Sequence, residues 1–147
     1  MRIVALETTQ RIGTVAAFDD EHLLDAFTLT PHQRSAQSLL PGLDRLLRRV
    51  GWDPTEIGLV TVAAGPGSFT GLRIGVTAAK MLALVVGAEL VAVNTLHVIA
   101  ARADRPAGRL WTILDAQRGQ LFTSQFRVNE NGPPREKIGR ASCRERV

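Results

Sequence analysis

A glycine-rich segment separates an apolar run from a long apolar stretch in the middle of this chain. It reads GPGSFTGLRIG over residues 65–75, after IGLVTVAAG and before small and apolar residues that continue to residue 86. The first stretch is typical of a buried strand and the last of a helix. A strand that turns directly into a helix is a building unit of α/β folds. We therefore predict an α/β fold around this unit.

The flanking patterns predict a mixed sheet. The first thirty residues contain three short strands joined by tight turns, and leucines at helical spacing follow over residues 35–50. Pro41 lies inside that pattern, so the helix is either kinked there or begins near it. The predicted order of elements then continues with a strand at 88–93 and a short helix at 94–103, which Asn94 or Thr95 caps. It ends with a hairpin that turns at 118–119. Nothing regular is expected after residue 134.

The glycines have two interpretations. A glycine-rich turn at a helix N-terminus can hold an anion, with Ser68 and Thr70 as donors. However, the spacing is one residue too long for a dinucleotide fingerprint, and the Gly-Lys-Ser/Thr triplet of a P-loop is missing. Gly71 and Gly75 share one helix face, and each costs the helix about 1 kcal/mol relative to alanine. We favour close backbone packing, with anion binding as the alternative.

The helix predicted at 68–86 is apolar or small at nearly every position, so we expect it to be buried on most sides. Its polar exceptions, Arg73, Thr77 and Lys80, form one stripe. No uninterrupted apolar run is long enough to cross a bilayer, and the N-terminus does not resemble a signal peptide. We expect a cytoplasmic protein.

The basic charge is concentrated at the C-terminus. Residues 137–147, KIGRASCRERV, contain four basic residues and one acidic residue, which is +3 of the net +4, and also the single cysteine, Cys143. The last ten letters resemble the translation of a widely used sequencing adapter, so we expect this tail to be foreign to the natural protein. The rest is near neutral and contains no tyrosine, which argues against a nucleic-acid stacking surface.

No catalytic set is visible. The histidines, His22, His32 and His97, lack metal-site spacing, and we expect His97 to be a packing residue. Glu7 and Asp115 end predicted strands, where a carboxylate either holds magnesium beside a phosphate or, more often, caps a turn. We therefore expect no catalytic residue, no metal and no cofactor.

Several segments together resemble the TsaB family, over residues 1–126. They are the three N-terminal strands, SAQSLLPGLDRLL, GPGSFTGLRIGVTAAKMLAL, VNTLHVIA and ILDAQRGQLF. The residues of the most specific motif are Gly65, Pro66, Gly67, Ser68, Phe69, Thr70, Gly71, Arg73 and Gly75. The resemblance implies the actin/Hsp70/sugar-kinase (ASKHA) fold. Residues 1–104 would form the first lobe, and 105–136 the opening hairpin of a truncated second lobe.

The resemblance also implies a non-catalytic subunit. TsaB-like proteins pair with a TsaD-like threonylcarbamoyltransferase that modifies the tRNA adenosine next to the anticodon. A TsaE-like ATPase would join the same complex, a homodimer would form in the absence of partners, and contact with tRNA would be indirect, without a membrane. The implied interface lies on helices 35–50 and 68–86, and our candidates are Leu43, Leu46, Leu47, Arg73, Thr77 and Lys80. The leucines fit an intramolecular core equally well.

Two positions depart from the family pattern. Glu7-Thr8 stands where the family often has Asp-Thr, and Ser35 where it often has His. The longer carboxylate side chain of Glu7 weakens the first alternative function, an ATP-dependent phosphotransferase or ATPase of the ASKHA fold. A metallo-endopeptidase is the second alternative, and it would need ligands that the sequence does not offer.

Overall fold

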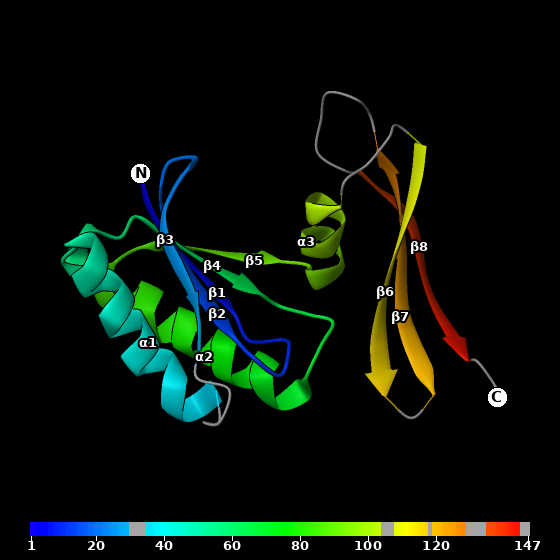
Figure 1. Ribbon diagram of the computed structural model, residues 1–147, viewed down its shortest axis with the longest axis horizontal. Coiled ribbons are helices and arrows are strands. Elements are labelled where there is room, and N and C mark those ends of the chain that lie inside the picture. Colours follow the sequence, from blue (N-terminus) through cyan, green and yellow to red (C-terminus); the bar gives the residue numbers. More distant parts are fainter. Residues whose placement is uncertain (30–34, 104–107, 118, 129–134, 145–147) are drawn as a thin grey trace. The chain divides into compact units, whose positions relative to one another are not determined.

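The computed structural model describes residues 1–29, 35–103, 108–117, 119–128 and 135–144, and the chain divides into two compact units. Unit 1 comprises Met1–Ala64 and Ser68–Val93, and unit 2 comprises Gly65–Gly67 and Asn94–Val147. The division follows Val93 rather than residue 104, because α3 (Thr95–Arg102) packs against β6 (Gly108–Gln117). Each unit is described by itself below (Figure 1).

Unit 1 contains a five-stranded mixed sheet in the order β3-β2-β1-β4-β5. The strands are β1 (Arg2–Glu7), β2 (Thr14–Asp19), β3 (His22–Thr28), β4 (Leu59–Ala63) and β5 (Glu89–Val93). The first three form an antiparallel meander, whereas β4 runs parallel to both β1 and β5. The predicted α/β fold with a mixed sheet is confirmed.

Two long helices cover this sheet. Helix α1 (Ser35–Val50) packs against β2 and β3, α2 (Phe69–Val86) packs mainly against β4, and the helices also contact each other (Figure 1). The core between helices and sheet includes Val4, Leu46, Val60 and Ala79, all of them fully buried. Helix α1 begins well before Pro41 and continues through it, so a start near Pro41 is excluded.

Glycines end the two long helices of unit 1, and a carboxylate caps its short helix. Gly51 and Gly87 follow the two long helices with φ values of 70° and 74°, in the left-handed region that glycine adopts without strain. Asp53 caps the 3-10 helix η1 (Pro54–Glu56). Hydrogen bonds from the hydroxyl and backbone N–H of Thr55 hold the pKa of Asp53 below its ordinary value.

Unit 2 contains a three-stranded antiparallel sheet in the order β6-β7-β8, with β7 (Gln120–Val128) and β8 (Arg135–Arg144). Asn94 caps α3, because its Oδ1 accepts from Leu96 N at 2.8 Å. Phe126 is buried against α3, and the ring of His97 meets it edge-on at a centroid distance of 4.8 Å. The predicted β6–β7 hairpin and the packing role of His97 are confirmed; Arg118 in the turn lies outside the described residues.

The expectation of nothing regular after residue 134 is wrong, because β8 pairs with β7 along its length. With β6 on one side only, β7 would leave the backbone N–H and C=O groups of its other edge unpaired. An extended segment without proline can satisfy them through its own backbone, and it does not need the side-chain alternation from which we predict strands.

The expectation that α2 is buried on most sides is also wrong. Only Gly71, Gly75, Ala79 and Ala83 of this helix are buried. Leu84 and Val85 are 79% and 77% exposed, because the sheet covers a single face of the helix. By length and mean hydropathy, α2 also meets the criteria for a membrane-spanning helix, although Arg73 and Lys80 interrupt its apolar residues and core helices of soluble proteins meet the same criteria.

Candidate functional site

The glycines of the motif seat α2 on the turn that follows β1. A Cβ atom at Gly71 would lie 1.9 Å from the Thr8 carbonyl oxygen, and one at Gly75 would lie 2.1 Å from Thr8 Oγ1. Thr8 is fully buried, and its hydroxyl donates to the Gly71 carbonyl at 2.8 Å. The predicted close packing is confirmed, and its partner is Thr8, which meets Gly71 with its backbone and Gly75 with its side chain.

Ser68, one of the two candidate anion donors, holds the turn into α2. Gly65 has a φ of 110°, and the bond that joins it to Pro66 is cis. Ser68 is the N-cap, since its Oγ accepts from Gly71 N at 3.3 Å while its own N–H donates to the Thr9 carbonyl at 2.8 Å. Ser68 is thus engaged in the fold, and anion binding stays a prediction.

Glu7 likewise has a structural role. Its Oε1 accepts from the N–H of Thr9 at 2.5 Å and also from the Thr9 hydroxyl. The carboxylate therefore caps the turn after β1, which is the commoner of the two roles that the sequence left open. Within the described ranges, no three side chains of His, Cys, Asp or Glu gather as a metal site would require. His22 is exposed, and His32 lies outside those ranges.

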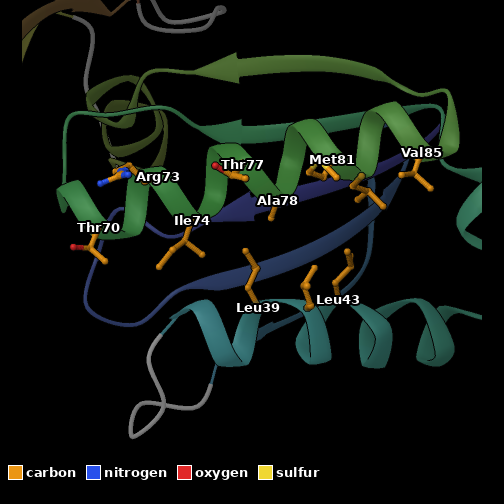
Figure 2. Close-up of a pocket in the computed structure, with 11 residues that line it drawn as sticks. Leu39, Leu43, Thr70, Arg73, Ile74, Thr77, Ala78, Met81 and Val85 are labelled. Carbon is orange, nitrogen blue, oxygen red and sulfur yellow. The ribbon is translucent and has the colours of Figure 1, made fainter.

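A long apolar groove runs between α1 and α2. Its volume is about 730 Å³, and Figure 2 shows Leu39 and Leu43 of α1 facing α2 across it. The residues that line it share helical spacing on the facing sides of the two helices. They are Leu39, Leu40, Leu43, Thr70, Arg73, Ile74, Thr77, Ala78, Met81, Leu82 and Val85.

The rim of this groove is exposed although it is apolar. Leu40 and Met81 are 62% and 56% exposed, and Val85 is more exposed still. Exposed apolar surface of this extent marks a place where another surface binds, since water solvates it poorly. On α2, the buried glycines face the turn after β1, and Met81 and Val85 lie away from the sheet. The groove is therefore a candidate docking surface.

The predicted interface residues are distributed between the groove and the core. Leu43, Arg73 and Thr77 line the groove, and Lys80 is exposed on α2 without lining it. Leu46 and Leu47 are buried between α1 and the sheet, so the intramolecular alternative holds for them.

Sequence reasoning missed most of the groove. The missed residues that line it are Leu39, Leu40, Thr70, Ile74, Ala78, Met81, Leu82 and Val85. Of these, Thr70 is predicted from the sequence as a motif residue and a candidate anion donor, but not as an interface residue. The signal that could have found them is the composition of α2, which carries more apolar surface than one sheet can cover.

Comparison with known proteins finds relatives that are named for a tRNA modification. The family described as TsaD, tRNA N6-adenosine threonylcarbamoyltransferase, matches residues 29–134. The chain is 37% identical over 136 residues to the tRNA threonylcarbamoyladenosine biosynthesis protein TsaB of Escherichia coli and 33% identical over 133 residues to that of Bacillus subtilis. Each alignment covers 90% of this chain, which spans only 58% and 57% of those relatives.

A solved structure shows the same fold. YeaZ from Pseudomonas aeruginosa superposes with a TM-score of 0.87 at 27% identity, and the superposition covers 99% of this chain and 69% of that one. The similarity therefore extends over both units of the chain described above, each with its own sheet.

Proposed function

Because this chain belongs to the TsaB branch of the threonylcarbamoyltransferase family, we propose that it is a non-catalytic subunit of the machinery that makes threonylcarbamoyladenosine in tRNA. Its partner is a TsaD-like subunit that performs the transfer. A TsaE-like ATPase belongs to the same complex, tRNA is contacted indirectly, and the complex works in the cytoplasm. Without partners, the chain pairs with a second copy.

The observation that carries this proposal is the groove between α1 and α2. A surface helix of a monomeric protein usually turns its apolar side chains to the core, yet Met81 and Val85 point outward. The groove is bounded by two helices, a geometry that accepts the ridge of side chains of a further helix. Its apolar lining resembles the core of a stable protein–protein interface.

The roles of the polar groups support a subunit without its own chemistry. A phosphotransferase of this fold would need the carboxylate at the end of β1 to face a nucleotide or its metal. Here the Glu7 carboxylate is engaged by Thr9, and the Ser68 hydroxyl caps α2. The Glu7 carboxylate holds the turn after β1, and the Ser68 hydroxyl holds the N-terminus of α2. Both groups therefore stabilise the position of α2, which forms one wall of the groove.

Co-purification tests the proposal. The protein is co-expressed with the TsaD-family subunit of the same genome, as wild type, Val85→Asp and Leu84→Asp. Leu84 and Val85 are adjacent on α2 and similarly exposed, but only Val85 lines the groove. We expect Val85→Asp to weaken binding by at least about tenfold, because a carboxylate would be buried without a partner.

Leu84→Asp controls for helix propensity and for the added charge, and we expect it to bind within about threefold of wild type. The unfolding temperature of each variant establishes that the fold is intact. The proposal is contradicted if wild type does not bind the TsaD-family subunit, or if it binds equally well with Val85→Asp. Turnover of ATP or of a peptide by the purified protein would favour one of the two enzymatic alternatives.

A further inference from the structure

Arg73 is the only charged side chain among the described residues that line the groove. Figure 2 shows it near the N-terminal end of α2, beyond Ile74 and Thr77. Its guanidinium carbon lies 5.3 Å from the centroid of the Phe69 ring, one helical turn back. A guanidinium that lies over an aromatic face is held in place, and the N–H donors in the plane of the guanidinium can still bind a carboxylate.

Among the residues that the structure describes, no carboxylate pairs with this cation. Arg48 and Arg49 each form an ion pair, with Asp44 and Asp25, whereas no ion pair joins Arg73 to any acidic side chain of the described residues. Helix α2 contains two basic residues and no acidic one, and residues 35–43 of the facing wall of the groove contain no acidic residue either. Both walls therefore lack a negative charge next to Arg73.

The position of Arg73 on α2 adds to the positive electrostatic potential at this end of the groove. Side chains of a helix lean toward its N-terminus, so the guanidinium lies over the first turn of α2, beside Phe69. The N-terminal end of a helix carries a partial positive charge, which favours anions and disfavours cations. A cation is thus held where the helix itself would disfavour it, at one end of an otherwise apolar groove.

We propose that Arg73 is the specificity determinant of the groove and that it pairs with a carboxylate of the docked TsaD-like subunit. This inference rests on the function proposed above. When the partner covers the groove, an unpaired guanidinium would lose hydration without compensation, so the partner must supply an aspartate or glutamate there. The apolar remainder of the groove contributes affinity, and this one pair sets the direction in which the partner helix lies.

Charge substitution at Arg73 tests the inference. The affinity of the protein for the TsaD-family subunit of the same genome is measured for wild type, Arg73→Gln and Arg73→Glu, at low and high salt. The matched control is Arg45→Glu, because Arg45 of α1 is also stacked on a phenylalanine, Phe27, at 5.3 Å but lies outside the groove. Thermal unfolding of each variant verifies its fold.

We expect Arg73→Gln to weaken binding about tenfold and Arg73→Glu about a hundredfold, with Arg45→Glu within about twofold of wild type. Salt should weaken wild-type binding more than that of Arg73→Gln. Each acidic residue on the helices of the TsaD-family subunit is then changed to arginine, and one such change should restore binding to Arg73→Glu. That rescue identifies the partner carboxylate.

Three results would overturn the inference in distinguishable ways. If wild type binds and both Arg73 variants bind within twofold of it, Arg73 has no role in specificity, although the proposed function stands. If wild type does not bind the TsaD-family subunit at all, the proposed function fails and this inference with it. If the protein only self-associates, and Val85→Asp abolishes that association, the occupant of the groove is a second copy of the chain.

Discussion

Thr8 and the two helical glycines form the closest tertiary contact of the motif. The threonine is buried after β1, and both its carbonyl oxygen and its hydroxyl oxygen occupy the space that a side chain on α2 would need. The cost of glycine in a helix, about 1 kcal/mol at each position, is therefore offset by a backbone approach that alanine does not permit. The geometry distinguishes the two glycines, since Gly71 meets backbone and Gly75 meets a side chain.

That distinction gives a prediction at the residue scale. Gly71→Ala should lower the free energy of unfolding by about 3 kcal/mol or more, because the Thr8 carbonyl cannot move without the strand. Gly75→Ala should cost less, about 1–2 kcal/mol, and Thr8→Ala in the same chain should recover part of that loss by removing Oγ1. Urea unfolding measures Gly71→Ala and Gly75→Ala, each with and without Thr8→Ala. An equal rescue of Gly71→Ala by Thr8→Ala would contradict the assignment.

At the scale of elements, β3 is an edge strand with features that hinder pairing with a strand of another molecule. The Asp25 carboxylate accepts from the N–H of the next residue, Ala26, at 2.9 Å, and Arg49 of α1 holds the same carboxylate at 2.7 Å. The register with β2 also shifts at Leu24, which is left without a partner residue. A charge, a bulge and an occupied backbone N–H each hinder the addition of a further strand.

We therefore expect Asp25→Ala to accelerate aggregation of the folded protein, because it exposes the Ala26 N–H and removes the charge from the edge. Asp44→Ala is the matched control, since it removes another carboxylate that pairs with an arginine of α1 but lies on the helix. The lag time of thioflavin fluorescence under agitation, at equal protein concentration, is the measurement. Identical lag times for the two variants would mean that Asp25 does not guard the edge.

At the scale of the whole molecule, the two units have separate hydrophobic cores. Leu46 belongs to the cluster between α1, α2 and the five-stranded sheet, whereas Phe126 belongs to the cluster of α3 with β6 and β7. No residue is shared between these two clusters of described residues. A compact unit with its own core can lose its structure independently of its neighbour.

This organisation predicts where a core substitution acts. Leu46→Ala should reduce the hydrogen-exchange protection of amides in unit 1 by about 2–5 kcal/mol, the usual cost of truncating a buried leucine, with little change in unit 2. Phe126→Ala should do the converse. Exchange followed by mass spectrometry of peptides from both units measures the effects. Equal loss of protection in both units after either substitution would show a single cooperative domain.

The order of strands and helices in unit 1 could be predicted from the sequence, because the period of apolar residues is local information. The strand before the glycine motif, the cap at Ser68 and the stop at Gly87 follow from residue type and spacing alone. The pairing of Gly71 and Gly75 on one helix face could also be predicted, since 3.6 residues form each turn.

Only the tertiary structure decided which apolar surfaces remain exposed. Periodicity shows that Leu46 and Val85 are both apolar helix positions, but it does not show that one faces the sheet and the other a groove. That outcome depends on the single layer of strands under α1 and α2 and on Thr8, which is sixty-odd residues distant in sequence and fixes the rotation of α2. Likewise, β8 forms because β7 offers an edge, which is a property of the neighbouring strand rather than of its own residues.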